Sequence, residues 1–181
     1  IQPLSSSAPP EIVEAGHIII ATGSSPRDIP HVPMDGKLIV DSAGALAFQE
    51  APKSVGIIGA GVIGLELGSV WKRLGSDVIL LEAMDEFLAM ADEQIAQVAW
   101  KEFARQGLGI RLGTRVLSAI TAKNQVAINY QDKEGDHVLN CDRLIVAVGR
   151  KPSTEGLNAT GVGLLLDERG FIYVDEYCRT N

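Results

Sequence analysis

Several features are scarce in this 181-residue chain, and each scarcity narrows what the chain can do. It has only two cysteines, Cys141 and Cys178, which form no C-x-x-C or comparable close pair. That pattern favours two unrelated thiols in a reducing compartment over a disulfide framework or a zinc site. The three histidines, His17, His31 and His137, are scattered, and none has metal-ligand or triad spacing with another. We therefore predict no metal site.

Basic clusters and long apolar runs are also missing. The net charge is −7 without any concentration of Lys or Arg, which argues against nucleic acid and anionic membrane surfaces as partners. No uncharged apolar run is long enough to cross a bilayer, and the opening IQPLSSSAPP lacks the charged region and apolar core of a signal peptide. These absences predict a cytoplasmic location. With 46% hydrophobic and 22% charged residues, the chain can bury the core of one domain or slightly more.

Residues 54–82, SVGIIGAGVIGLELGSVWKRLGSDVILLE, are the most informative stretch that is present. A short apolar run leads into G-x-G-x-x-G, formed by Gly59, Gly61 and Gly64. An amphipathic stretch follows, and then a second apolar run that closes on Glu82. Strand, tight glycine turn, helix, strand and acidic end, in this order and length, are typical of a dinucleotide-binding βαβ unit.

Each glycine of this stretch has a physical role. Gly59 lets the chain turn sharply off the strand, and Gly61 lets a pyrophosphate approach the backbone closely. Gly64, with Gly68 one turn later, lets the helix lie close to the sheet. The first N–H groups of that helix have no partners within it, and the helix dipole adds partial positive charge there. The helix start is therefore predicted to bind an anion without a basic side chain.

Glu82 predicts the choice of dinucleotide. It lies 18 residues after Gly64, at the end of the second strand. A carboxylate there accepts hydrogen bonds from a ribose 2′-hydroxyl and repels a 2′-phosphate. From Ala83 to Ala99 there is no Arg or Lys to receive such a phosphate. The pattern favours NAD over NADP.

The remaining periodicity predicts an α/β fold with a Rossmann-type parallel sheet. Continuous apolar runs at His17–Thr22 and Arg143–Val148 are typical of buried strands, and Gly170–Val174 suggests one more short strand. From Thr114 the period changes to two, which predicts an inserted antiparallel meander of three strands. Two helices are expected to turn apolar faces inward. Their inward residues are predicted to be Ile63, Leu67, Val70, Trp71 and Leu74 in the first, and Ile95, Val98, Ala99 and Phe103 in the second.

Four segments together resemble the pyridine nucleotide–disulfide oxidoreductase family: HIIIATGSSP, GIIGAGVIGLELGSVWKRLGSDVILLE, LIVAVGRKP and DERGFIYVDEYCRTN. Within the family the chain is most similar to the dihydrolipoamide dehydrogenases. The resemblance implies a flavoenzyme that passes electrons from dihydrolipoamide through a protein disulfide and FAD to NAD+. It also implies, as partners, a second identical subunit and the lipoyl domains of 2-oxo acid dehydrogenase complexes.

The resemblance also assigns cofactor contacts to individual residues. The NAD pyrophosphate and the approach to nicotinamide would be lined by Gly59, Ala60, Gly61, Val62, Ile63, Gly64, Leu65 and Glu66. Glu82 would hold the adenosine ribose, Val116 would contact the adenine end and Gly149 the nicotinamide end. A flavin-contacting segment is matched by Thr22, Gly23 and Ser24. Glu66 also matches a family acid that pairs with a lysine near the flavin.

Other family features are not in this sequence: the flavin-binding βαβ unit, the C-x-x-x-x-C disulfide and the His–Glu acid/base pair. We therefore expect an NAD-binding domain over residues 38–150, flanked by flavin-domain segments at 1–37 and 151–181. FAD would bind only in the intact parent, and no residue of this chain is assigned a catalytic role. Two alternatives stay open: another enzyme of the family, of mercuric reductase or transhydrogenase type, and a stand-alone nucleotide-binding, redox-sensing module.

Overall fold

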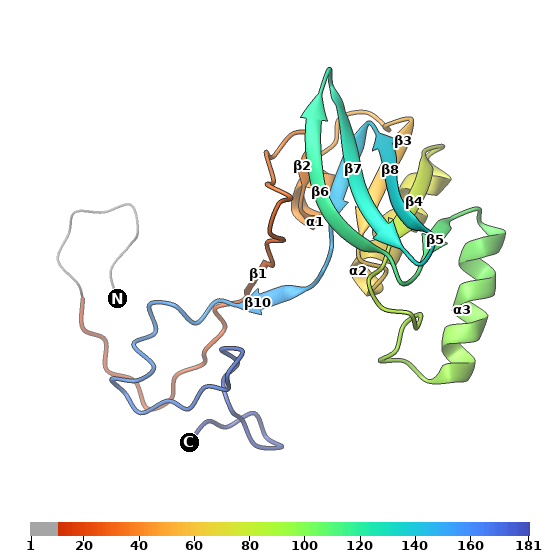
Figure 1. The fold of residues 1–181 in the computed structure, drawn as a ribbon. Coiled ribbons are helices and arrows are strands. Elements are labelled where there is room, and N and C mark those ends of the chain that lie inside the picture. Colours follow the sequence, from red (N-terminus) through yellow and green to blue (C-terminus); the bar gives the residue numbers. More distant parts are fainter. Residues whose placement is uncertain (1–10) are drawn as a thin grey trace. The chain divides into compact units, whose positions relative to one another are not determined.

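The computed structural model describes residues 11–181 and divides the chain into two compact units (Figure 1). The larger unit is Ser24–Lys151, and the smaller one joins the chain up to Gly23 with Pro152–Asn181. The assignment of residues 1–37 and 151–181 to a flavin domain stays a prediction.

A five-stranded sheet forms the centre of the larger unit, and all its neighbouring strands are parallel. Its order is β2 (Ile39–Val40), β9 (Arg143–Val146), β3 (Ser54–Ile58), β4 (Asp77–Leu81) and β5 (Gly109–Arg111). The strands are nearly continuous apolar runs, because both faces of the sheet are covered. This arrangement confirms the predicted Rossmann-type α/β fold.

Helices α1 (Ser42–Leu46) and α2 (Val62–Arg73) pack on one face of this sheet. In α2 the buried side includes Gly64 and Gly68 beside Leu65, Leu67 and Trp71. The predicted inward face is partly wrong, since Val70 and Leu74 are 46% and 59% exposed. The glycines turn toward the sheet and allow a close approach, which rotates the buried stripe away from these two residues.

Helix α3 (Glu93–Arg105) begins at Asp92, whose carboxylate accepts a hydrogen bond from Gln94 N at 2.9 Å. The prediction that Ile95 and Val98 face inward is wrong, because they are 63% and 65% exposed. The prediction holds for Ala99 and Phe103, which are half-buried and share a face of the helix with buried Ala96. Phe103 packs against the cluster of buried apolar residues that α2 shares with the sheet.

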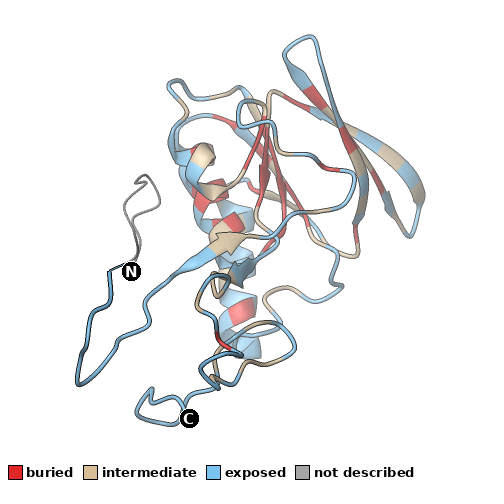
Figure 2. Cartoon of the chain, turned by 90° about the vertical axis from the view of Figure 1, so that its left-hand side faces the viewer, coloured by how far each residue is buried: buried red, intermediate tan, exposed pale blue. Residues whose placement is uncertain are grey.

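The predicted antiparallel meander is confirmed, and it covers the other face of the sheet. It consists of β6 (Arg115–Ala122), β7 (Gln125–Asp132) and β8 (Gly135–Cys141). Figure 2 shows buried residues along the strands of both sheets. On the inner side of the meander, Val126 and Ile128 are fully buried. Gly56 in β3 makes room for Ile128, since a Cβ at position 56 would lie 2.8 Å from Ile128 Cδ1.

The expected strand at His17–Thr22 is absent from the structure: Ile18 and Ile19 are 81% and 90% exposed. The strand expected at Gly170–Val174 is reduced to one antiparallel bridge, Leu166↔Ile172. An apolar run forms a parallel strand only beside others, and the described part of the smaller unit offers no such sheet. Among residues 11–181, no helix combines the length and apolarity needed to cross a membrane.

Candidate functional site: a pocket at the carboxyl ends of the parallel strands

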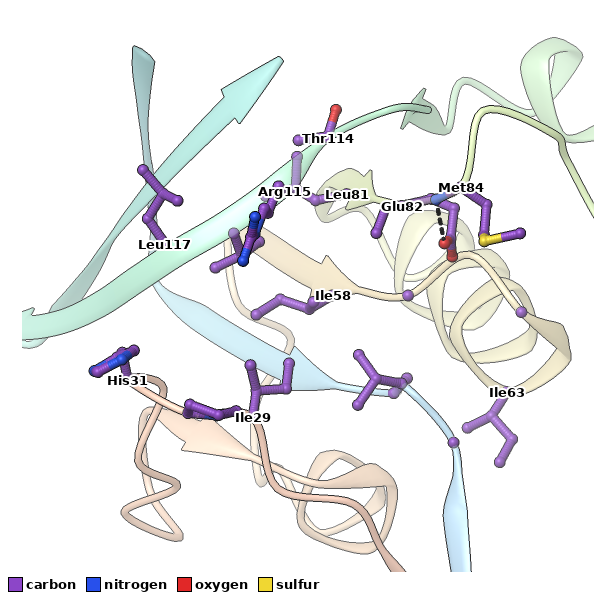
Figure 3. Close-up of a pocket in the computed structure, with 18 of the residues that line it drawn as sticks. Ile29, His31, Ile58, Ile63, Leu81, Glu82, Met84, Thr114, Arg115 and Leu117 are labelled. Atoms are coloured by element: carbon purple, nitrogen blue, oxygen red, sulfur yellow. Dashed lines mark hydrogen bonds between the residues drawn. The ribbon is translucent and has the colours of Figure 1, made fainter. Parts of the chain in front are cut away.

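A cavity of about 930 Å³ in the larger unit lies where β3, β4 and β9 end (Figure 3). Chain segments leaving all three strands line it, at Gly59, Glu82 and Ala147. Strand β3 has β4 on one side and the much later β9 on the other, so the connections diverge at β3. Open α/β sheets bind ligands at such a point, outside the carboxyl ends of the strands.

Two glycines shape the turn that follows β3. Gly59 has a φ of +100°, and a Cβ there would lie 2.5 Å from the carbonyl oxygen of Ala147. A Cβ on Gly64 would overlap the carbonyl oxygen of Gly59. Both positions therefore need glycine for the fold itself: the first for its backbone conformation, the second for packing.

Gly61 differs from these two because a Cβ there would meet nothing within 4 Å. It is the N-cap of α2, with ordinary extended dihedrals, and it lines the pocket. Space is thus left open beside the unpaired N–H groups of the first helical turn, which carries no acidic residue. A phosphate fits this place by charge and by the room that the missing side chain leaves.

The carboxylate of Glu82 holds the glycine turn in place. Its Oε2 accepts a hydrogen bond from Ala60 N at 2.8 Å. Its Oε1 accepts one from Met84 N at 2.9 Å, the dashed line in Figure 3. A carboxylate offers about four acceptor positions, so Glu82 keeps capacity for donors of a ligand. The glycine turn after β3 and the carboxylate of Glu82 after β4 therefore meet in one pocket.

The structure brings half of the predicted contact residues to this pocket. It is lined by Gly59, Gly61, Val62, Ile63, Glu82, Val116 and Gly149. Ala60 and Leu65 are 3% and 2% exposed and lie behind its wall, as does buried Gly64. Glu66 is exposed on α2, one turn into the helix, and does not line the cavity.

The residues predicted to contact flavin lie elsewhere. Ser24 belongs to β1 (Ser24–Pro26), which pairs with β10 (Arg150–Pro152). Its hydroxyl accepts a hydrogen bond from Arg150 Nε at 2.7 Å. Thr22 and Gly23 belong to the smaller unit.

Sequence reasoning missed several lining residues, including Thr114, Arg115 and Leu117. A signal for them existed, since they follow β5, whose carboxyl end meets the same edge of the sheet as β3 and β4. Ile29 and His31 had no such signal: they come from a loop whose packing is set by the meander, with Ala119 N donating to His31 O at 3.2 Å.

Cys141 is buried and far from a reactive state. Only 2% of the residue is exposed, and burial raises the pKa of its thiol to about 11. Cys178 is exposed and lies in the smaller unit. Within residues 11–181, no group of His, Cys, Asp and Glu is arranged to hold a metal ion.

The amino-acid sequence matches a known protein family and several of its characterised members. The model of the family described as pyridine nucleotide-disulphide oxidoreductase matches residues 5–181. A dihydrolipoyl dehydrogenase of Cupriavidus necator is 53% identical over 94% of this chain and 36% of its own length. Dihydrolipoyl dehydrogenase 3 of Pseudomonas aeruginosa is 45% identical over 88% of this chain and 35% of its own. The chain thus spans about a third of the length of these relatives.

Solved structures agree with the fold. The HOCl-induced flavoprotein disulfide reductase RclA of Escherichia coli, as a Cu(II) complex, superposes with a TM-score of 0.76 at 33% identity. The match covers 88% of this chain and 36% of that protein. LpdA of Mycobacterium tuberculosis reaches a TM-score of 0.78 at 26% identity, over 88% and 34% of the two chains.

Proposed function

Because the chain belongs to the pyridine nucleotide-disulphide oxidoreductase family, we propose that its larger unit is the NAD(H)-binding part of a flavoenzyme of dihydrolipoamide dehydrogenase type. The observation that carries the proposal is the hydrogen bond from Ala60 N to Glu82 Oε2 at 2.8 Å. It brings the acid expected to bind ribose into the pocket where the glycine turn leaves room for a phosphate.

Within this proposal the start of α2 binds the pyrophosphate. The free N–H groups of the first turn donate to phosphate oxygens, and the helix dipole stabilises the negative charge. Gly61 supports this role because its missing side chain leaves the approach open. Gly59 and Gly64 support it indirectly, by fixing the turn and the closeness of the helix to the sheet.

Glu82 binds the adenosine ribose and disfavours a 2′-phosphate by charge repulsion. Its contacts with Ala60 N and Met84 N keep the carboxylate in place before any ligand arrives, so less ordering is required on binding. Val116 borders the adenine side of the same pocket. NADH is therefore the preferred nucleotide.

Another part of the pocket wall is apolar and suits a nicotinamide ring. Ile63, Val148 and Gly149 line it, and Gly149 has a φ of +114°. The bound cofactor supplies hydride chemistry at that ring. The residues of this chain position the ring and exclude water from one side of it.

The flanking segments and the rest of the enzyme complete the proposal. Thr22, Gly23 and Ser24 contact FAD, and Glu66 pairs with a lysine near the flavin. Of the predicted flanks 1–37 and 151–181, the parts outside the larger unit, up to Gly23 and from Pro152 on, pack in the flavin domain of the whole enzyme. The whole enzyme is a dimer of identical subunits and takes electrons from the lipoyl domains of 2-oxo acid dehydrogenase complexes. The proposed location is cytoplasmic, which the scarcity of cysteine supports.

A second candidate is a flavoprotein disulfide reductase with another substrate. The similarity to RclA, with 33% identity and a TM-score of 0.76, favours it. Both candidates use the same nucleotide pocket. Dihydrolipoamide oxidation by the full-length enzyme, measured as NADH formation, separates them: turnover supports the first candidate, and its absence in a flavin-loaded enzyme supports the second.

Titration calorimetry of the 181-residue chain with NADH and NADPH tests the proposal. We expect NADH to bind more tightly, and Glu82→Ala to narrow the difference. Glu86→Ala is the matched control, because Glu86 is an exposed acid of the same loop that does not line the pocket. NADPH binding equal to or tighter than NADH binding by the unmodified chain contradicts the assignment.

A further inference from the structure

A cation shares the wall of the pocket with Glu82. We propose that Arg115 is a second determinant of nucleotide selectivity: with Glu82 charged the pair favours an unphosphorylated ribose, and with Glu82 neutralised Arg115 binds a 2′-phosphate. This inference rests on the proposed function. Arg115 lies outside the segment after β4, where a basic residue for a 2′-phosphate would be expected but where Ala83 to Ala99 contain no Arg or Lys.

Backbone hydrogen bonds fix position 115 beside Glu82. Glu82 N donates to Arg111 O at 2.8 Å, and Thr114 N donates to Glu82 O at 2.8 Å. Gly113 N donates to Met84 O at 2.9 Å, so the turn after β5 is held against the residues after β4 at three points. Thr114 is 2% exposed, and Arg115 is the next residue along the chain.

The side chain of Arg115 is available to a ligand. It is exposed and lines the pocket, and Figure 3 shows it between Leu117 and Glu82. No hydrogen bond or ion pair holds its guanidinium among the residues that the structure describes. Arg111, four residues earlier, differs: it donates to Tyr130 Oη and lies over that ring.

The two charges have opposite effects on a phosphorylated ribose. Glu82 repels a 2′-phosphate, while the guanidinium of Arg115 presents a planar set of donors that matches phosphate oxygens. Arginine stays charged at all working pH values, so removing the charge of Glu82 leaves a net cation in this part of the pocket. Glu82→Gln removes the charge while its amide oxygen still accepts one of the two backbone hydrogen bonds.

The test uses ligands that report on the adenosine end alone. Adenosine 2′,5′-bisphosphate and 5′-AMP are titrated by calorimetry into the unmodified 181-residue chain, Glu82→Gln, and Glu82→Gln with Arg115→Ala. Arg73→Ala in the Glu82→Gln background is the matched control, because Arg73 is an exposed arginine at the far end of α2, outside the pocket. Unfolding temperatures check that each variant folds, and Arg115→Met replaces Arg115→Ala if the latter does not.

We expect Glu82→Gln to bind the bisphosphate about tenfold or more tightly than the unmodified chain does, as a new charge-assisted contact implies. Arg115→Ala should remove that gain, Arg73→Ala should keep it, and high salt should weaken it. No gain in Glu82→Gln, or a gain that survives Arg115→Ala, overturns the inference. If the unmodified chain binds NADH but Arg115 has no effect, only this inference fails. If the unmodified chain binds neither NADH nor 5′-AMP, the proposed function fails as well.

Discussion

Gly61 and Gly64 belong to the same motif, yet the structure predicts opposite consequences for replacing them with alanine. Gly64 is buried against the turn, and its new methyl group would overlap the Gly59 carbonyl oxygen. Gly61 faces open space in the pocket, with nothing within 4 Å of a new Cβ. Gly64→Ala should therefore damage the fold, and Gly61→Ala should damage ligand binding.

The expected cost of Gly64→Ala follows from overpacking. Extra methyl groups in a packed interior cost ~1–3 kcal/mol, and the upper part of that range applies because a backbone carbonyl cannot move aside as a side chain does. Alanine recovers about 1 kcal/mol through its higher helix propensity. The net loss is about 1–2 kcal/mol, which lowers the unfolding temperature by roughly 2–8 °C.

Gly61→Ala should cost the fold less. Its φ of −75° and ψ of −178° suit alanine, and only the weaker preference for alanine at an N-cap counts against it, at ~0.5–1 kcal/mol. NADH affinity should fall by about tenfold or more, because the methyl group stands where a phosphate would meet the backbone. Thermal unfolding by circular dichroism and NADH calorimetry measure the two effects.

Gly68→Ala is the control for a glycine of the same helix. Its new Cβ would lie 3.3 Å from Ile57 Cδ1 and 3.4 Å from Leu108 Cδ2, two side-chain ends that can shift. We expect nearly unchanged stability and unchanged NADH affinity. An unfolding temperature of Gly64→Ala equal to that of the unmodified chain, or NADH affinity untouched by Gly61→Ala, would refute the reasoning.

Two further expectations concern the thiols and the flanks. A thiol reagent should modify exposed Cys178 in the folded chain and reach Cys141 only on unfolding; fast modification of both contradicts the burial of Cys141. Because burial raises the pKa of Cys141 from 9.0 to about 11, its contribution to stability is complete below pH 9 and is lost as the pH rises toward 11. Cys141→Ala should weaken that alkaline decline, measured as the difference between the two proteins in denaturant unfolding. Limited proteolysis should trim the chain toward residues 24–151, because exposed segments such as Ile18–Ile19 contribute few buried contacts; equal resistance of the flanks would count against this.

Local sequence signals predicted the βαβ unit and the meander. The order of apolar run, glycines and Glu82 is short-range information, and the turn at Lys123-Asn124 adopts the positive φ values, 48° and 67°, that suit a tight hairpin. Asp41 likewise caps α1, accepting a hydrogen bond from Gly44 N at 2.8 Å. These features depend on neighbours within a few residues.

Other features depend on contacts that no local pattern contains. In α3, packing against the rest of the unit decides which side chains are buried. Ala96 and Phe103 lie on the packed side, although Ile95 and Val98 are the more apolar residues. The apolar run at His17–Thr22 looks like a buried strand, but a strand needs hydrogen-bonding neighbours. Arg115 follows β5, which was one signal for it, but a search for a basic residue close to Glu82 in the sequence misses it. Three backbone hydrogen bonds between the segments after β4 and β5 bring it to the pocket.

The central claim is that a pyridine nucleotide binds in the pocket formed by the glycine turn and Glu82. The most direct measurement is a titration of the isotope-labelled chain with NADH, followed by backbone amide chemical shifts in NMR spectra. We predict the largest shifts at residues 59–63, at Glu82, at Val116 and at Gly149. Saturable binding whose shifts lie mainly outside these segments, for example on the exposed strand faces of the meander, would contradict the account.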